Sequence, residues 1–171
     1  RFALEIALNI LQIPSLEGLA LQVKWPNDLY SLQGKWGGIL VEPLNAHQAV
    51  VGVGLNVLPI PNEGIEQTAI SLTELGLKQP DRIQLTADLY LAIQQAGEWF
   101  NHNSCNLSAR FNHYAAFKNQ PVEIEHLQGI SQGVFLGIRN DGAIEIQQDD
   151  KVEHYFQGRL RLQIAPQSEH L

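Results

Sequence analysis

The amino-acid sequence predicts an α+β protein: a mixed or antiparallel sheet with helices, followed by a small barrel made only of strands. Two observations carry this prediction. In residues 1–119, stretches with the helical spacing of apolar residues are mixed with short apolar stretches bounded by turn residues. From residue 120 onward the helical spacing is lost, and apolar and polar residues alternate as in half-buried strands. We therefore expect two domains, residues 1–119 and residues 120–171.

The first part of the chain is expected to begin with a helix and to continue as strands. Apolar residues at positions 2, 6, 10 and 13 lie near helical spacing, and Pro14 ends the run. Gln33 and Gly34 form a tight turn, which makes residues 29–42 a hairpin. We expect strands over residues 19–23, 29–32, 36–42 and 49–57, and a loop over residues 58–67.

Helices are expected again before the chain changes character. Residues 71–75 could form a helical turn, Asp81 could cap a long helix, and a shorter helix is expected over residues 107–116. The apolar face of the long helix would comprise Leu85, Leu89, Ile93, Ala96 and Phe100. Beyond it, the triplet Asn-Asp-Gly at residues 140–142 is a strong hairpin signal, and residues 149–150 offer a second turn. The strand-only barrel is expected over residues 121–164.

Composition and charge exclude several classes of protein. The chain has 171 residues and a formal net charge of −7, so we expect no nucleic-acid binding. Its apolar runs are far shorter than the roughly 20 residues that span a bilayer, so we expect no membrane partner. Cys105 is the single cysteine, which excludes an internal disulfide and fits a reducing, cytoplasmic location. The chain begins at Arg1 and contains no methionine, so we expect its natural start to be missing.

Charged and polar residues follow the first predicted strand. The run Lys-Trp-Pro-Asn-Asp at residues 24–28 leaves a strand at its lysine and continues onto a loop, a common place for functional side chains. Lys35 stands at the start of the next long strand, where a cation could neutralise a carboxylate or a phosphate. The alternatives are an ordinary strand exit with a surface aspartate, and a hairpin lysine in solvent.

Glycines interrupt two predicted strands, at residues 37–38 and at Gly52 and Gly54. A glycine weakens a strand, so it often marks close approach of a ligand or another backbone; the alternative is a sheet that bends to pack. The run at residues 52–56 lacks the spacing and the following helix of dinucleotide- or phosphate-binding loops. No pair of histidines has zinc-ligand spacing, and Cys105 has no obvious base, so no metal ligand and no cysteine nucleophile are expected. Spacing alone therefore indicates an anion-binding site on residues 24–56.

Four motifs in order make the chain resemble biotin–protein ligases. They are Lys-Trp-Pro-Asn-Asp at residues 24–28, Gly-Lys-Trp-Gly-Gly-Ile-Leu-Val-Glu at 34–42, Gly-Val-Gly-Leu-Asn-Val at 52–57 and Ala-Ile-Ser-Leu at 69–72. The expected barrel is similar to the family's SH3-like C-terminal domain. The resemblance covers essentially the whole chain. It implies that the first domain is part of a ligase core of the class II aminoacyl-tRNA-synthetase-like type.

The resemblance also implies a two-step reaction that uses ATP, Mg²⁺ and biotin. The carboxylate of biotin attacks the α-phosphate of ATP, which gives biotinyl-5′-adenylate and pyrophosphate. A lysine of the biotin carboxyl carrier protein then attacks the adenylate. Because the first step joins two anions, cations must offset their repulsion.

The functional residues of the family carry over to the matching positions. Lys35 would hold the biotin carboxylate and the phosphate together, and Lys24 would add positive field near the phosphates. Asp28 would orient Lys35, Mg²⁺ or the incoming amine, and these three are the expected catalytic residues. Trp25 is expected to pack rather than to contact a ligand. The residues expected to bind biotin or the adenylate are Lys35, Asn27, Gly37, Gly38, Gly52, Gly54, Leu55, Asn56 and Ala69.

Departures from the family pattern leave alternatives open. The family's Gly-Arg-Gly-Arg-type loop and the strands that wall the biotin pocket belong upstream of the first expected helix. We therefore expect an incomplete copy of a full ligase. Gly158 and Arg159 stand where many relatives have Gly-Glu, so no role in ATP binding is assigned to Arg159 or Arg161. One alternative is a lipoate–protein ligase-like enzyme, although Lys-Trp-Pro-Asn-Asp favours biotin. Another is a non-catalytic fragment that binds the carrier or a partner subunit, with an exposed sheet edge that could serve a homodimer.

Overall fold

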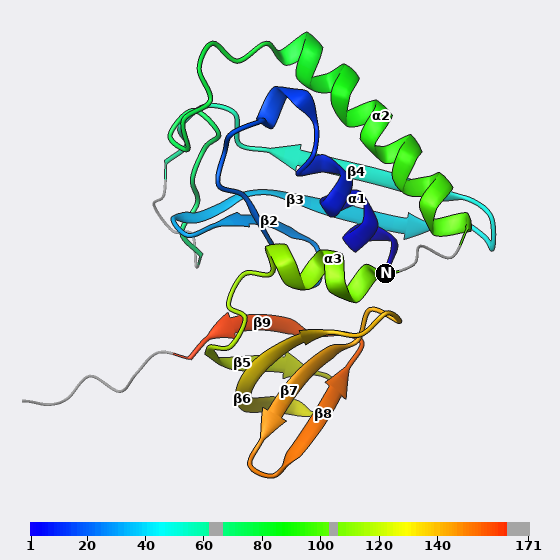
Figure 1. The fold of residues 1–171 in the computed structure, drawn as a ribbon, viewed down its shortest axis with the longest axis vertical. Coiled ribbons are helices and arrows are strands. Elements are labelled where there is room, and N and C mark those ends of the chain that lie inside the picture. The colour runs from blue at the N-terminus through cyan, green and yellow to red at the C-terminus, as the bar shows by residue number, and fades with distance from the viewer. Residues whose placement is uncertain (62–66, 103–105, 164–171) are drawn as a thin grey trace, which may run out of the picture.

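The computed structural model describes residues 1–61, 67–102 and 106–163, and within them it confirms the predicted α+β class (Figure 1). Helices and strands of the first part are followed by five strands in a row. None of the described helices is long and apolar enough to cross a membrane. The elements are α1 (Phe2–Ile10), the 3-10 helix η1 (Pro14–Leu16), β1 (Gln22–Lys24), β2 (Asp28–Ser31), β3 (Gly34–Pro43), β4 (Ala49–Leu55), α2 (Arg82–Asn101), α3 (Leu107–Tyr114), β5 (Pro121–His126), β6 (Gly129–Ile138), β7 (Ile144–Gln148), β8 (Lys151–Tyr155) and β9 (Arg159–Leu162).

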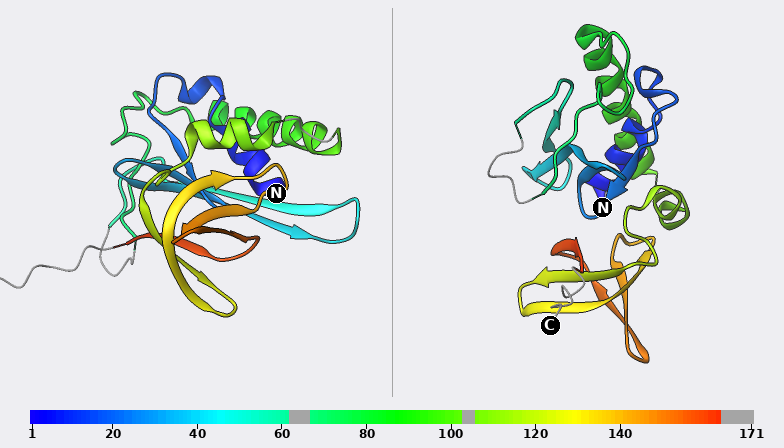
Figure 2. Two further views of the ribbon diagram at one scale, coloured as in Figure 1. Left: turned by 60° about the horizontal axis from the view of Figure 1, so that its bottom comes forward. Right: turned by 90° about the vertical axis from the view of Figure 1, so that its left-hand side faces the viewer.

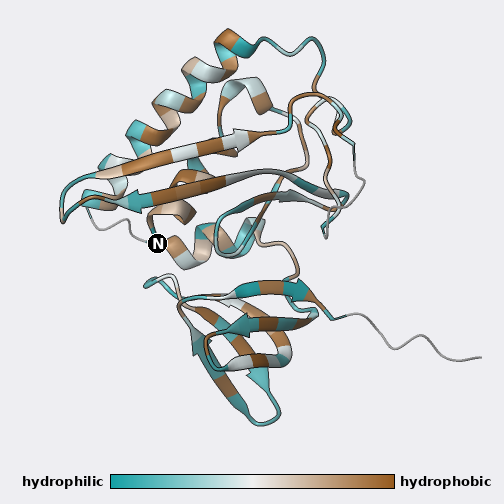
Figure 3. Cartoon of the chain, turned by 180° about the vertical axis from the view of Figure 1, so that it is seen from behind, coloured by the Kyte–Doolittle hydropathy of each residue, from teal (hydrophilic) through white to brown (hydrophobic). Residues whose placement is uncertain are grey.

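The first sheet has the strand order β1-β2-β3-β4, and all of its neighbouring strands are antiparallel. Helices α1 and α2 pack against each other on one side of this sheet, and α1 contacts β3 (Figure 1). Figure 3 views the sheet from the opposite side and shows that β3 and β4 are apolar along much of their length. Leu29 and Ile39 are buried in the core of this layer, whereas Asp28 and Tyr30 are only half-buried. The two faces of the sheet therefore differ, as alternation along a strand requires.

Several boundaries differ from the sequence expectation. Helix α1 ends at Ile10, three residues before the expected end, and Ile13 is extended because the residue before a proline disfavours helical backbone. Strand β1 covers residues 22–24 rather than 19–23, since only those residues lie opposite β2. Residues 71–75 form one turn, in which Leu75 N donates to Ser71 O at 3.1 Å. Part of the loop expected over 58–67 and Cys105 lie outside the described residues.

The second sheet has the order β8-β7-β6-β5-β9, is fully antiparallel and curls strongly (Figure 2). The expected hairpin signal at residues 140–142 does connect β6 to β7, and residues 149–150 connect β7 to β8. Its inner face is closely packed. The fully buried side chains there are Val122, Ile124, Phe135, Ile138, Ile144, Ile146 and Leu160. In both Figure 1 and Figure 2, β9 lies on the side of this sheet that faces the first one.

Candidate functional site

Three of the predicted site residues form one cluster on adjacent strands. The Nζ atom of Lys35 lies 2.6 Å from Oδ1 of Asp28, and the Nζ atom of Lys24 lies 3.3 Å from Oδ2. Each oxygen of the carboxylate therefore has its own ammonium group. Two lysines and one aspartate carry a net charge of +1 at pH 7 on a chain of net charge −7. This is the kind of local field that attracts an anionic ligand.

The strand register sets these residues in a row across the sheet. Lys24 pairs with Asp28, Asp28 pairs with Gly38, and Gly38 pairs with Gly54. Paired residues in antiparallel strands point to the same face, so one row joins the charged residues to two of the predicted glycines. Gly52 lies on the same face, two residues from Gly54, and both are exposed. The row has charges at one end and bare backbone at the other, so an extended anionic molecule can lie along it.

An irregularity in β3 brings Lys35 to this face. Leu29 pairs with Gly37 and Tyr30 pairs with Lys35, which leaves Trp36 as one extra residue in β3. In a regular strand Lys35 would share a face with Gly37 and would point away from Gly38. The extra residue acts as a β-bulge, a feature that often redirects a side chain next to an active site.

The two neighbouring glycines serve different purposes. A Cβ atom on Gly38 would lie 3.5 Å from Nζ of Lys35 and 3.8 Å from Oδ1 of Asp28, so Gly38 keeps the space above the ion pair open. A Cβ atom on Gly37 would lie only 2.6 Å from the carbonyl oxygen of Gly54, on the core face. The structure therefore brings Gly38 to the cluster and turns Gly37 toward the core. Leu55 pairs with Gly37 and packs in the same core.

The remaining predicted residues build the frame around Lys35. Nδ2 of Asn56 donates to the carbonyl oxygens of Lys35 and Ile70 at 3.3 and 3.2 Å, and Ala69 forms an isolated parallel bridge with Lys35. Nδ2 of Asn27 donates to the carbonyl oxygen of Ile39 at 2.7 Å. The segments 24–28, 34–38, 52–56 and 69–72, which are far apart in sequence, thus meet at one place. Roles of these residues in binding biotin or an adenylate stay predictions.

Burial separates the two lysines. The side chain of Lys35 is 37% exposed, whereas the side chain of Lys24 is 6% exposed. Burial lowers the pKa of Lys24 below its ordinary value because it disfavours the charged form, and the nearby carboxylate of Asp28 partly offsets this effect. Lys35 can therefore reach a ligand on the open face, while Lys24 is almost fully buried.

Sequence reasoning missed two neighbours of Lys24. Its Nζ atom lies 5.7 Å from the centre of the Tyr30 ring, within the range of a cation–π contact. Burial also raises the pKa of the Tyr30 hydroxyl. Arg161 of β9 is close enough for its positive charge to help lower the pKa of Lys24. The alternation of β2 could have indicated Tyr30, which is two residues from Asp28, but no local signal indicates Arg161.

Trp25 links the cluster to the second sheet. Its side chain is 1% exposed, and its Nε1 donates to the carbonyl oxygen of Gly142 at 3.0 Å. It is therefore packed in the core, and its indole holds the β6–β7 turn against the segment that carries Lys24 and Asp28.

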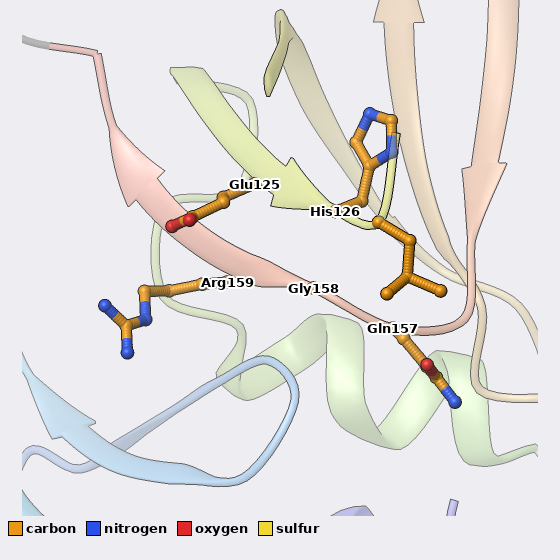
Figure 4. A pocket seen from close by; sticks show the side chains of 6 residues that line it. Glu125, His126, Gln157, Gly158 and Arg159 are labelled. Carbon is orange, nitrogen blue, oxygen red and sulfur yellow. The ribbon is translucent and has the colours of Figure 1, made fainter. Parts of the chain in front are cut away.

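A pocket of about 380 Å³ lies elsewhere, in the second sheet (Figure 4). Glu125 and Arg159 extend toward one end of this pocket, and His126 and Gln157 lie at the other. It is open to solvent and includes none of the predicted site residues. We place the candidate site at the lysine–aspartate row because charges, bare backbone and four sequence motifs coincide there.

Clusters of metal-ligating side chains were sought in the part of the chain that the structure describes. Among residues 1–61, 67–102 and 106–163, no group of three or more histidine, cysteine, aspartate or glutamate side chains could hold a metal ion. Both oxygens of Asp28 already face ammonium groups.

Comparisons with known proteins relate the chain to a family of ligases. Residues 2–56 match the model of the Biotin/lipoate A/B protein ligase family. The chain is 32% identical over 152 residues to the bifunctional ligase/repressor BirA of Salmonella typhimurium, which covers 85% of the chain and 47% of BirA. It is 39% identical over 82 residues to biotin–[acetyl-CoA-carboxylase] ligase of Mycobacterium tuberculosis, which covers 47% of the chain and 30% of that protein. The chain thus spans no more than about half the length of these curated relatives.

Solved structures show the same fold. The biotin protein ligase of Aquifex aeolicus in complex with biotin and ATP superposes with a TM-score of 0.80 at 24% identity, over 96% of this chain and 71% of that one. A mutant of the same protein in complex with biotin gives a TM-score of 0.82, also at 24% identity, over 95% of this chain and 71% of that one. The likeness extends through both sheets, because 95% of this chain cannot be matched by the first sheet alone.

Proposed function

Since residues 2–56 match the model of the Biotin/lipoate A/B protein ligase family, we propose that this chain carries the ATP-dependent chemistry of a biotin–protein ligase. The observation that carries the proposal is the row Lys24, Asp28, Gly38 and Gly54, with Lys35 placed over it. The relative from Mycobacterium tuberculosis is a biotin–[acetyl-CoA-carboxylase] ligase, which favours biotin over lipoate as the substrate.

In the first proposed step, the carboxylate of biotin attacks the α-phosphate of ATP. A P–O bond forms, and the bond to the β-phosphate breaks with its electron pair on pyrophosphate. Lys35 suits this step because its ammonium is partly exposed and lies above open space at Gly38. A preorganised cation offsets the repulsion between the two anions and the charge that develops in the transition state. Mg²⁺ would arrive with the phosphates of ATP, and no step here depends on a protein-bound metal.

In the second proposed step, a lysine amine of a biotin carboxyl carrier protein attacks the carbonyl carbon of the adenylate. A C–N bond forms, and the C–O bond to the phosphate breaks with its electron pair on AMP. Asp28 lies beside Lys35 and is 14% exposed, so it can accept a hydrogen bond from the incoming amine and take the proton that the amine sheds.

The proposal extends to the organisation and setting of the protein. We propose two domains, residues 1–119 as the ligase core and residues 120–171 as an SH3-like domain built on the five-stranded sheet. We also propose that the reaction takes place in the cytoplasm. Strand β4 forms one edge of the first sheet, so a homodimer that pairs two such edges would be compatible with the fold.

A transfer assay tests the proposed function. The chain would be mixed with biotin, ATP, Mg²⁺ and a biotin carrier domain, and the intact mass of the carrier would be measured over time. We expect a biotin-sized mass gain that falls about 100-fold or more in Lys35→Ala, because a preorganised charge is lost. Lys151→Ala is the matched control, since Lys151 lies at the distant β7–β8 turn. A mass gain with lipoate in place of biotin would make lipoate the proposed substrate. No gain with either acid would favour a non-catalytic, carrier-binding fragment.

A further inference from the structure

We infer that Lys24 is a positioning residue that keeps Asp28 ionised while the ligand occupies Lys35. This inference rests on the proposed function and deepens it. In this role the buried Lys24 acts on Asp28 of the same motif, rather than on the phosphates of ATP.

The first support is the geometry of the shared carboxylate. Lys35 contacts Oδ1 of Asp28 and Lys24 contacts Oδ2, so the two ammonium groups occupy different oxygens. Lys24 and Asp28 are also paired in register across β1 and β2, which fixes their separation through the backbone. Lys35 reaches Asp28 from a position of β3 that pairs with Tyr30 rather than with Asp28. Lys35 can therefore leave Asp28 without disturbing the contact between Lys24 and Asp28.

The second support is the burial of Lys24. Its side chain is 6% exposed, and its ammonium lies 5.7 Å from the centre of the Tyr30 ring. An ammonium buried to this degree is poorly placed to contact an anion on the open face, whereas Lys35, which is 37% exposed, can contact one. The two lysines of the site thus face different partners.

The third support is electrostatic. When Lys35 turns to a carboxylate and a phosphate, Asp28 loses one counterion and gains anionic neighbours, and both changes favour its protonation. The charged and titratable groups around Asp28 are Lys24 on β1, Tyr30 on β2, Lys35 on β3 and, more distant, Arg161 on β9. Arg161 lies 3.9 Å from Glu125, an anion of its own sheet. Lys24 is therefore the cation that remains in contact with Asp28 in the loaded site.

The consequence concerns the transfer step. Asp28 can take a proton from the carrier amine only as a carboxylate. With Lys24 charged, Asp28 stays ionised, the amine nitrogen bonds to the acyl carbon, AMP leaves, and the proton passes to Asp28 and then to water. Without Lys24, the carboxylate loses the cation that stabilises its ionised form, and this route becomes slower.

The test is a single-turnover transfer from pre-formed biotinyl-5′-adenylate to the carrier domain, measured between pH 5 and pH 10. Lys24→Met removes the charge and keeps the length of the side chain, Lys24→Arg keeps the charge, and Lys151→Met is the distant control. We expect Lys24→Met to move the acid limb of the rate profile upward by about one to three pH units. On that limb the rate then falls about tenfold per unit. Lys24→Arg should restore the acid limb.

Two further measurements separate this role from a structural one. In an Asp28→Asn background, Lys24→Met should change the rate less than about twofold, because the residue it acts through is gone. Lys24→Gln, which also removes the charge, should move the acid limb in the same direction as Lys24→Met, whereas Lys24→Arg, which stays charged, should leave it in place. This second comparison decides the question even where Lys24→Met fails to fold.

Other results overturn the inference. An unmoved acid limb in Lys24→Met, or a rise in the KM for ATP with an unmoved limb, would show that Lys24 serves the phosphates or only the fold. Transfer by the unsubstituted chain, together with either result, leaves the proposed function standing and removes only the role of Lys24. No transfer by the unsubstituted chain at any pH overturns the proposed function, and the role of Lys24 with it.

Discussion

Lys35 and Gly38 share a face of the sheet only because Trp36 is an extra residue in β3. The motifs indicated both residues, and the alternation rule alone would have separated them. The same rule would have set Gly37 beside Lys35, yet Gly37 faces the core. Residue types in a motif thus indicate that a site exists, and the register of the sheet selects which of them meet.

The two neighbouring glycines give a prediction at this scale. Gly37→Ala should lower the free energy of unfolding by about 1–3 kcal/mol, because its Cβ would clash with the carbonyl oxygen of Gly54. Gly38→Ala should change it by less than about 0.5 kcal/mol, since its Cβ has room. Urea denaturation of both variants measures the difference. Equal losses would contradict the assignment of the two glycines to opposite faces.

At the scale of elements, helix α2 shows how local signals and distant contacts combine. Asp81 caps it as predicted, since its Oδ1 accepts from the backbone N–H groups of Ile83 and Gln84 at 2.9 and 3.0 Å. Farther along the helix, Asp88 is 5% exposed and accepts from the N–H and the hydroxyl of Ser15 in η1. These hydrogen bonds lower the pKa of Asp88. The cap is a local signal that the sequence displays, whereas the bond to Ser15 joins residues 73 positions apart.

The lowered pKa of Asp88 gives a prediction for stability against pH. A carboxylate with a depressed folded-state pKa contributes stability above its unfolded pKa of about 4, and this contribution is lost as pH falls through the folded-state pKa. Asp88→Asn should therefore cost about 2 kcal/mol at pH 7 and progressively less toward pH 2. Urea denaturation across that range, with the turn variant Asp150→Asn as the control, measures the change. A difference in the free energy of unfolding between the unsubstituted protein and Asp88→Asn that stays constant with pH would argue against this role of Asp88.

At the scale of the whole molecule, a buried ion pair joins three helices. Glu5 of α1 is fully buried, and its two oxygens accept hydrogen bonds from Nη2 of Arg110 in α3 at 2.6 and 2.7 Å. The guanidinium also stacks on Trp99 of α2, 4.7 Å from the ring centre. The bond from Trp25 to Gly142 then ties this layer to the second sheet. These contacts hold the surface that carries the lysine–aspartate row in one orientation.

Arg110→Met should lower the free energy of unfolding by about 3 kcal/mol, because it leaves the carboxylate of Glu5 buried without a counterion. Arg139→Met is the matched control. Its partner is Asp141 at 3.4 Å, and both side chains are at least 42% exposed, so the loss should stay under about 1 kcal/mol. Thermal and urea denaturation measure both variants. Similar losses in the two proteins would mean that the buried pair does not join the helices as described.

The sequence by itself determined the α+β class, the hairpin turn at residues 140–142 and the cap at Asp81, because these depend on the periodicity and chemistry of neighbouring residues. It also indicated Lys24, Asp28 and Lys35, because the motifs that contain these residues can be read directly in the sequence. Only the tertiary structure decided that Lys24 is buried, that the bulge at Trp36 redirects Lys35 and that Gly37 faces the core. The physical reason is that exposure, register and charge pairing depend on segments that meet only when the chain has folded, and no local pattern records them.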